Sequence, residues 1–179
     1  MVQIKVTLRG LRPPIWRRLV VAGDATLAQL HVVLQIAMGW EDEHLHCFRI
    51  GGLRYGPADD AFSDELDEET ASITDTLGAV GRGEYDYDFG DSWEHELVVE
   101  KPKQPLVSSG IASCLGGRRA CPPEDCGGVW GYANLLHVLA DPAHEDHEDR
   151  LEWLGGSFDP GAFDQKAVNA ALEGFTTGR

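Results

Sequence analysis

The chain has 179 residues, of which 42% are apolar and 25% are charged, a composition typical of a globular protein rather than of a disordered tail. Its 15 basic and 30 acidic residues give a formal net charge of −15, which argues against wholesale binding to nucleic-acid phosphates. No window approaches the roughly 18 apolar residues of a membrane helix, and residues 1–9 lack the pattern of a signal peptide, so a cytoplasmic protein is expected.

The N-terminal segment predicts a hairpin followed by a helix. Residues 2–9 carry apolar side chains at every second position, the period of a half-buried strand, and residues 15–21 are rich in β-branched and aromatic types. Thr26 followed by Gln29 matches a capping box, and an apolar repeat with helical spacing continues from there to Gly39. We therefore expect two paired strands and then one well-defined helix.

The next segment returns to strand composition and then becomes acidic. Residues 44–50 and 53–56 flank a two-glycine turn and predict another hairpin, so the chain begins strand, strand, helix, strand, strand. Residues 59–69 contain seven acidic residues and no basic one, the composition of a solvated loop or a weak surface helix. Residues 73–80 have the pattern of a short helix.

Aromatic and acidic residues then alternate before a long connection. Tyr85, Tyr87 and Phe89 alternate with two aspartates, as in a strand with one aromatic face. Residues 96–100 predict a further strand. The prolines, serines and glycine of residues 102–110 indicate a long irregular connection.

The last third predicts three helices. An apolar repeat from Tyr132 to Leu139 marks the first, and an Asp-Pro pair stops it. A second helix is expected from about residue 144 to residue 154. A third is expected to start at the Asp159-Pro160 pair and to carry an apolar stripe as far as Phe175.

Together these elements predict an α+β fold. We expect a mostly antiparallel sheet crossed by the first helix, with a helical C-terminal segment packed on it. The expected organisation is one domain over residues 1–179. It divides into a sheet-rich core over 1–100, an irregular loop over 101–128 and a helical segment over 129–176.

The segment 85–95 gathers chemically active side chains around one glycine turn. Asp88, Asp91 and His95 offer carboxylate and imidazole groups, which serve both as ligands of divalent cations and as acid–base groups. The alternative is that the Gly-Asp-Ser sequence is simply a turn in which the aspartate bonds its own backbone.

Three histidines earlier in the chain are further candidates. His44 and His46 are two residues apart on a predicted strand, so their side chains leave the same face about 6 to 7 Å apart, a spacing suited to two ligands of one metal ion. The alternative is that both face solvent or pack against Trp40. His31 lies near the apolar stripe of the predicted helix and is expected to be a hydrogen-bonded boundary residue.

The cysteines are expected to be reduced thiols, because a chain of this size forms a core without disulfides and shows no export signal. They are Cys47, Cys114, Cys121 and Cys126. The last three follow the spacing C-x6-C-x4-C, which differs from the C-x-x-C pairs of zinc ribbons. With a histidine they would still suffice for a structural zinc site.

The segment 121–128 predicts a rigid loop, because two prolines fix its backbone and two glycines permit a tight approach. This loop presents Glu124 and Asp125. The two carboxylates either border a functional site or cap the helix expected to start near Val129.

The first 18 residues contain basic residues and no acidic one. The basic residues are Lys5, Arg9, Arg12, Arg17 and Arg18. Trp16 lies beside two of them, a combination that suits a nucleic-acid strand or an acidic partner. Pairing with the protein's own acidic segments is the simpler explanation for these charges.

Several segments form a recognisable set in a fixed order. They are Pro13 to Arg18, Leu30-His31 through Gly39-Trp40, His44 to Phe48, Tyr85 to His95, Pro122 to Gly128, Gly131-Tyr132, Asp141-Pro142, Trp153 and Phe158 to Pro160. With this set the chain resembles the plasmid pRiA4b ORF-3-like family over nearly its whole length. The resemblance implies an α/β-roll-like domain in a bacterial or archaeal protein, often encoded on plasmids or beside mobile elements. Some relatives are labelled insertion-sequence passenger or resolvase-like proteins, but this chain has neither a serine-recombinase signature nor a basic recognition helix.

Three hypotheses about function follow. The first is a cytoplasmic binding module, linked to plasmids or mobile elements, whose cluster at residues 88–95 recognises a protein, a peptide or a small ligand. The second is a metal-dependent hydrolase or nuclease. The third is a non-catalytic protein with a structural zinc site.

Each hypothesis has its own candidate residues. The binding candidates are Trp16, Arg17, Arg18, Trp40 and Trp93. The catalytic candidates are Asp91, His95, Glu124 and Asp125. The metal-ligand candidates, with zinc as the expected ion, are His44, His46, Asp88, Asp91, His95, Cys114, Cys121 and Cys126.

Overall fold

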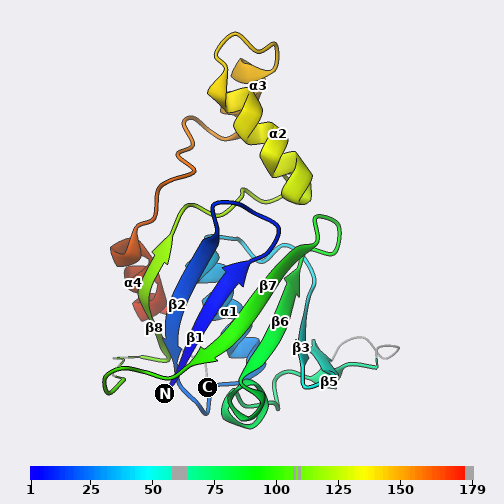
Figure 1. Cartoon of the computed structure of the whole chain (residues 1–179). Helices are drawn as coiled ribbons and strands as arrows, with labels where there is room; N and C mark the ends of the chain where they lie inside the picture. Colours follow the sequence, from blue (N-terminus) through cyan, green and yellow to red (C-terminus); the bar gives the residue numbers. More distant parts are fainter. Residues whose placement is uncertain (58–63, 107, 109, 176–179) are drawn as a thin grey trace.

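In the computed structural model, which describes residues 1–57, 64–106, 108 and 110–175, one eight-stranded sheet has the strand order β5-β4-β3-β6-β7-β1-β2-β8 (Figure 1). The strands are β1 (Val2–Leu8), β2 (Ile15–Val21), β3 (His46–Ile50), β4 (Leu53–Gly56), β5 (Leu66–Asp67), β6 (Arg82–Tyr87), β7 (Trp93–Glu100) and β8 (Ala112–Arg118). Neighbouring strands pair antiparallel except for β4 and β5, which are parallel. The predicted α+β class is therefore confirmed.

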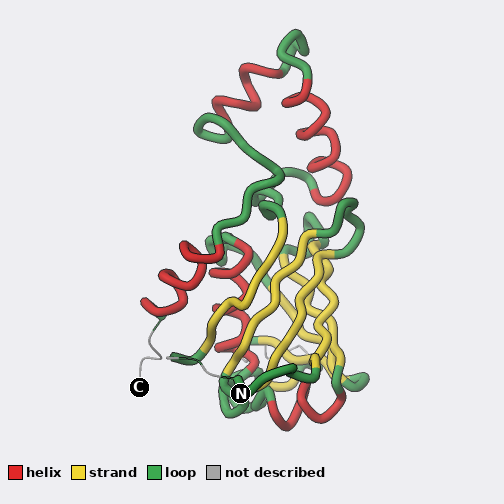
Figure 2. The backbone as a smooth tube through the Cα atoms, turned by 60° about the vertical axis from the view of Figure 1, so that its left-hand side comes forward, coloured by secondary structure: helices red, strands yellow, loops and turns green. Residues whose placement is uncertain are grey.

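The helices are α1 (Leu27–Met38), a π-helical turn η1 (Thr74–Gly78), α2 (Gly128–Ala140), α3 (His147–Trp153) and α4 (Gln165–Gly174). Helix α1 crosses one face of the sheet, and α4 lies against β8 and α1 (Figure 1). Helices α2 and α3 project beyond the ends of the strands as an arm (Figure 2). None of the helices in the described part of the chain has the length and apolar character needed to cross a bilayer.

The core lies between α1 and the sheet, as the period-two patterns predict. Ile4, Val6 and Leu8 of β1 are fully or almost fully buried, and the intervening side chains belong to the opposite face. The same alternation on β7 directs Trp93, His95 and Leu97 inward. The opposite face of the sheet carries charged side chains of β1, β2, β6 and β7.

The predicted capping box of α1 is confirmed. The Thr26 hydroxyl accepts a hydrogen bond from the Gln29 backbone N–H at 3.2 Å, and the Gln29 side chain accepts one from the Thr26 N–H at 3.0 Å. At the other end Gly39 has a left-handed φ of 86°, which glycine adopts without strain. Helix α1 is therefore fixed at both ends, and the chain leaves it at Trp40.

The capping box gives a first testable prediction. Thr26→Ala removes the acceptor for the Gln29 N–H and should lower the free energy of unfolding by about 1 kcal/mol, because a helix N-terminal donor is left without its partner. Urea denaturation monitored by circular dichroism measures this change. Thr26→Ser keeps the hydroxyl and serves as the control. An equal loss in both variants would contradict the capping explanation.

The structure differs from the expected elements in several places, including the segment 101–128, the start of the last helix and Phe89. The connection expected to be irregular over 101–128 contains β8. The two glycines of β8 have a low strand propensity, and pairing with β2 stabilises the strand. The last helix begins at Gln165 rather than at Asp159-Pro160, because the Asp164 side chain accepts hydrogen bonds from the backbone N–H groups of Lys166 and Ala167. Phe89 lies beyond the end of β6 and is exposed.

Candidate metal centre

The segment 41–46, which leads from α1 into the first residue of β3, supplies side chains to two neighbouring clusters of ionisable groups. The inner cluster consists of His31, Asp42, His46 and Glu68, and the outer cluster consists of His44, Asp88 and Asp125. Positions 42 and 46 belong to the inner cluster, and position 44 between them belongs to the outer one. The predicted pairing of His44 with His46 at one site does not occur, because β3 starts only at His46.

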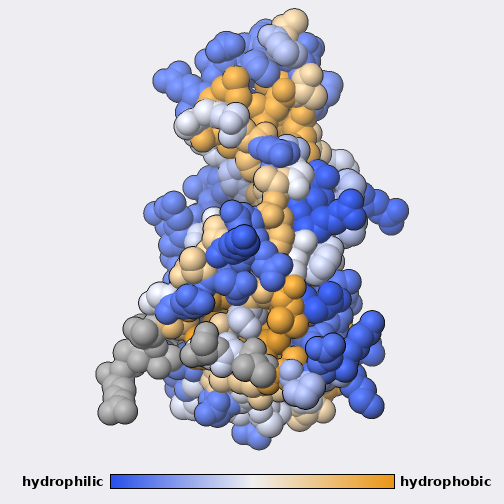
Figure 3. Space-filling model, turned by 90° about the vertical axis from the view of Figure 1, so that its left-hand side faces the viewer, coloured by the Kyte–Doolittle hydropathy of each residue, from blue (hydrophilic) through white to orange (hydrophobic). Residues whose placement is uncertain are grey.

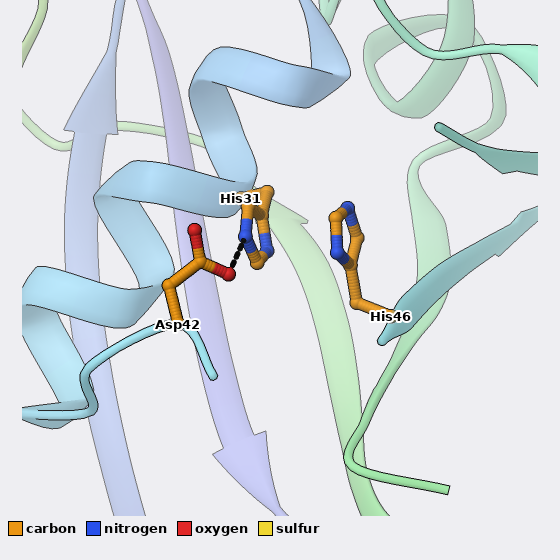
Figure 4. Close-up of side chains that lie close together, drawn as sticks. All are labelled: His31, Asp42 and His46. Carbon is orange, nitrogen blue, oxygen red and sulfur yellow. Dashed lines mark hydrogen bonds and ion pairs between the residues drawn. The ribbon is translucent and has the colours of Figure 1, made fainter. Parts of the chain in front are cut away.

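In the inner cluster two imidazole rings lie face to face. The rings of His31 and His46 are stacked with centroids 3.5 Å apart and an interplanar angle of 5° (Figure 4). His31 Nε2 lies 2.7 Å from Asp42 Oδ1, and His31 Nδ1 lies 2.8 Å from the hydroxyl of Tyr85. His46 Nε2 lies 2.9 Å from Glu68 Oε2. Each histidine therefore has its own carboxylate.

The inner network leaves His31 neutral. Gln35 donates to the Tyr85 hydroxyl at 2.9 Å, so that this hydroxyl is free to donate to His31 Nδ1 while Nε2 donates to Asp42. Burial, followed by the neighbouring His46, lowers the pKa of His31. Burial also raises the pKa of Tyr85 well above its usual value, which keeps the hydroxyl protonated.

The stacked geometry does not suit one ion shared by both imidazoles. The lone pair of an imidazole nitrogen lies in the ring plane. An ion in the plane of one ring would lie far from the plane of the other, because the two planes are nearly parallel with centroids 3.5 Å apart. We therefore assign the inner cluster a positioning role: it holds residues 42 and 46 on both sides of His44.

Glu68 shows how far the acidic run departs from its expected role. Residues 59–69 were expected to be solvated, and residues 59–63 lie outside the described part of the chain. Glu68 is 5% exposed, and its carboxylate contacts the His46 ring through both oxygens. Its partner is distant in sequence, so the acidic composition alone gave no sign of the pair.

The outer cluster has a different arrangement. His44 Nε2 lies 3.3 Å from Asp125 Oδ1 and 3.7 Å from Asp88 Oδ2, and one ligand atom from each of the three residues lies within 4.8 Å of the others. His44 Nε2 is buried and has no hydrogen-bond partner in the described part of the chain. The nitrogen thus lies at ion-pair distance from two carboxylates without a hydrogen bond to either.

Two loops bring the carboxylates to His44. Asp88 has a left-handed φ of 55°, and its Oδ1 accepts hydrogen bonds from the backbone N–H groups of Gly90 and Asp91, which leaves Oδ2 for His44. Asp91 Oδ2 accepts a hydrogen bond from the Gly127 N–H at 3.0 Å, and this bond ties the turn to the loop that carries Asp125.

Gly128 completes the contact between the two loops. It has a left-handed φ of 66°, and a Cβ atom at this position would lie 2.5 Å from the carbonyl oxygen of Asp91. Only glycine allows this approach. The expectation that Asp91 bonds the backbone of its own turn is wrong, because Asp88 accepts those hydrogen bonds and Asp91 accepts one from the other loop. Asp125, on that other loop, lies beside His44.

Aromatic side chains pack beside the outer cluster and fix the loops around it. Trp40 Nε1 donates to the Pro122 carbonyl at 2.9 Å, and the Trp40 ring stacks on Tyr87 at 5.0 Å. The Tyr87 hydroxyl donates to Glu124 and accepts from the Glu43 N–H at 3.1 Å. Glu124 is thus engaged beside the outer cluster, and its second oxygen accepts from the Glu41 N–H.

His95 lies in the core rather than in either cluster. It is fully buried, its Nδ1 donates to the Tyr85 carbonyl at 3.1 Å, and its Nε2 has no hydrogen-bond partner in the described part of the chain. Burial lowers the pKa of His95 to about 4. Trp93, two residues earlier, is buried on the same face of β7.

The candidate zinc-binding thiols have separate surroundings. Cys121 Sγ contacts Met38 Sδ at 3.2 Å, and Cys114 Sγ points towards the Gly116 carbonyl. Burial raises the pKa of Cys121 to about 11 and that of Cys126 to about 12. All four cysteines are free, and none belongs to the metal-compatible groups found among the described residues.

Arg17 and Arg18 of the basic hairpin both have partners within the protein. Arg17 is almost fully buried, and its guanidinium donates to the carbonyls of Ala37, Trp16 and Arg118. Arg18 forms a bidentate ion pair with Glu100 on the open face of the sheet. The Arg18 guanidinium also lies 5.2 Å from the ring of Trp16. The structure therefore places Arg17 in the core and Arg18 in an ion pair.

Sequence comparisons place the chain in a known family. The plasmid pRiA4b ORF-3-like protein family matches residues 1–167. The chain is 40% identical over 176 residues to a protein titled uncharacterized protein y4hQ from Sinorhizobium fredii (strain NBRC 101917 / NGR234), covering 96% of this chain and 90% of that relative. The fold is similar to the crystal structure titled protein of unknown function MM3350 from Methanosarcina mazei Go1, with a TM-score of 0.82, 38% identity, and coverage of 92% of this chain and 95% of that one. The chain belongs to the plasmid pRiA4b ORF-3-like family.

Proposed function

We propose that this protein binds one divalent transition-metal ion at the outer cluster and uses it for hydrolysis. The ligands are His44 Nε2, Asp88 Oδ2 and Asp125 Oδ1. The observation that carries the proposal is the buried His44 nitrogen, which faces two carboxylate oxygens at 3.3 and 3.7 Å without a hydrogen bond.

The separations suit a metal ion. Zinc binds histidine nitrogen and carboxylate oxygen at about 2.0 to 2.2 Å, so two ligands in tetrahedral geometry lie about 3.4 Å apart. The two separations from His44 are close to this value. The inner cluster adds support of the kind that metal sites use, because hydrogen bonds on both sides of His44 fix the segment that carries it.

Three protein ligands leave a coordination position for water or substrate, as in hydrolytic zinc sites. The side chain of Asp125 is 68% exposed, so the site opens towards solvent on that side. A pocket of about 380 Å³ adjoins it and is lined by several acidic residues. They are Glu41, Glu43, Glu124 and Asp125.

The charge of these carboxylates discriminates between phosphodiester substrates and neutral or cationic ester or amide substrates. The negatively charged lining of the pocket repels the phosphate group of a phosphodiester, whereas a neutral or cationic ester or amide is not repelled. We therefore favour hydrolysis of a neutral or cationic substrate over nuclease activity. Glu124, held beside the pocket by Tyr87 and the Glu41 N–H, is the candidate general base.

Metal binding is the direct test. Tag-free protein purified without chelator should contain about one equivalent of metal by elemental analysis and native mass spectrometry. His44→Ala should weaken zinc affinity by about 100-fold or more in calorimetric titration, because it removes the nitrogen ligand. His144→Ala is the matched control, since the two histidine side chains are 25% and 27% exposed and His144 faces one carboxylate instead of two.

Failure of the proposal would be visible in the same titrations. If the parent protein takes up none of zinc, manganese, cobalt or nickel, or if His44→Ala binds as tightly as His144→Ala, the outer cluster is only an ion pair. Loaded protein should hydrolyse p-nitrophenyl acetate faster than bis(p-nitrophenyl) phosphate. The reverse preference would favour the nuclease alternative.

A further inference from the structure

A second pocket, of about 590 Å³, lies between the turn that joins β1 to β2 and the first half of α2. Its volume is within the range of small-molecule sites. Most of its lining is apolar, and includes Leu11, Ile15, Val129, Trp130 and Leu136. No residue of this pocket belongs to the inner or the outer cluster.

Two arginines line this pocket without a carboxylate partner. The chain has twice as many acidic as basic residues, and among the described arginines four pair with acidic side chains, whereas Arg17, Arg82, Arg118 and Arg150, like the two in the pocket, form no ion pair. The four paired arginines are Arg9, Arg18, Arg49 and Arg54. In the described part of the chain, Arg12 and Arg119 form no ion pair, although both line the pocket. Two uncompensated positive charges beside apolar walls suit an anionic ligand.

Tyr132 adds an unused polar group to the same pocket. The residue is 3% exposed and lines the pocket, and its hydroxyl donates to no acceptor in the described part of the chain; the neighbouring Arg119 side chain is itself a donor. Burial raises the pKa of Tyr132 to about 12, with Arg119 as the main influence that lowers it. A buried hydroxyl without an acceptor for its proton is costly, so a ligand oxygen that accepts from it gains affinity.

The apolar walls are preformed, and one large side chain lies at their rim. A Cβ atom at Gly10 would lie 2.8 Å from Val129 Cγ2, so the turn and α2 are in close contact. Trp130 is 87% exposed. Figure 3 shows apolar side chains gathered on the projecting arm of α2 and α3. A ligand with an apolar body would cover the indole and remove it from water.

We propose that this pocket binds a small monocarboxylic acid with an alkyl or aryl body. The carboxylate lies between the guanidinium groups of Arg12 and Arg119 and accepts from the Tyr132 hydroxyl. The body packs on Trp130 and Leu136. This site is independent of the proposed metal site and involves no covalent step.

Octanoate and octanamide, a matched charged and neutral pair, provide the probes. Calorimetric titration of the full chain should show octanoate binding at least about tenfold more tightly than octanamide, because only the acid forms charge-assisted hydrogen bonds. Arg119→Gln should reduce octanoate affinity about tenfold and leave octanamide affinity unchanged. Arg82→Gln is the matched control, since Arg82 is an exposed arginine at the start of β6 and outside the pocket.

The optical signal identifies the pocket directly. Octanoate should shift the tryptophan emission to the blue, and Trp130→Phe should abolish the shift. Tyr132→Phe, which keeps the ring, should weaken octanoate binding as well. The proposal is wrong if octanoate binds no better than octanamide, or if Arg82→Gln weakens it as much as Arg119→Gln. It is also wrong if sedimentation shows a dimer that Trp130→Ala dissociates, because a second copy would then fill the pocket.

Discussion

Replacing Glu68 with alanine should lower the free energy of unfolding by about 3 kcal/mol at neutral pH, the largest single effect we expect outside the apolar core. The carboxylate is 5% exposed and contacts His46 Nε2 through both oxygens. Its removal leaves a buried imidazole nitrogen without an acceptor. The measurement is urea denaturation followed by far-ultraviolet circular dichroism.

Two further variants make the Glu68 result interpretable. Glu69→Ala is the matched control, because Glu69 is the exposed neighbour of the same residue type, and its change should stay within about 0.5 kcal/mol. Glu68→Gln keeps an acceptor oxygen and should lose less than Glu68→Ala. Equal stability of Glu68→Ala and Glu69→Ala would show that the His46 contact contributes nothing.

The second large effect concerns pH. His95 has a pKa of about 4 in the folded protein, whereas an unfolded histidine has a pKa near 6.5. Between these values the unfolded chain binds the proton and the folded chain does not, so stability falls as the pH falls. The loss begins near pH 6.5, reaches about 3 kcal/mol near pH 4, and levels off below that.

Urea denaturation at pH 7.5, 6.5, 5.5 and 4.5 measures this slope. His95→Leu should flatten it, whatever its effect on stability at pH 7.5, because the buried titrating group is gone. His31, whose pKa is also lowered by burial, contributes a slope of the same sign that remains in this variant. His137→Leu, at an exposed position, should leave the slope unchanged. A parent slope that persists in His95→Leu would refute the assignment.

Local sequence patterns predicted the elements whose stability is local. The capping box at Thr26, the alternation of β1 and the apolar stripe of α2 all appear where the residues indicate. Strand β8 was missed because Gly116 and Gly117 have low strand propensity, and its pairing with β2 is a contact between segments far apart in the chain. The local amino-acid composition does not indicate a contact between two segments that are far apart in the chain.

The candidate site was predicted in its residue types but not in its grouping. The expected association of Asp88 with His95 followed their closeness in sequence. The structure turns Asp88 towards His44 through a left-handed backbone, and the alternation of β7 carries His95 into the core. That alternation was visible in the sequence, since His95 shares its period with Trp93 and Leu97. The parity of β7 therefore separates His95 from Asp88.

The remaining site residues depended on tertiary contacts. Asp42 and Glu68 were overlooked because acidic residues in polar segments are normally solvated. Their role comes from the stacked histidines, one on α1 and one on β3, which the fold brings to 3.5 Å. No spacing rule connects residues 31, 42, 46 and 68.

The interleaving of the two clusters along residues 42–46 constrains how this gene can change. The side chains at positions 42 and 46 belong to the inner cluster, and the side chain at position 44 belongs to the outer cluster. Glu43 and Leu45, which lie between them, are exposed. Substitutions at those two positions leave both clusters intact. An insertion or deletion of a single codon would reverse the alternation and dismantle both clusters at once. Relatives that retain the site should therefore keep the length of this stretch fixed and vary freely at position 45, whereas position 43 should stay acidic because Glu43 lines the neighbouring pocket.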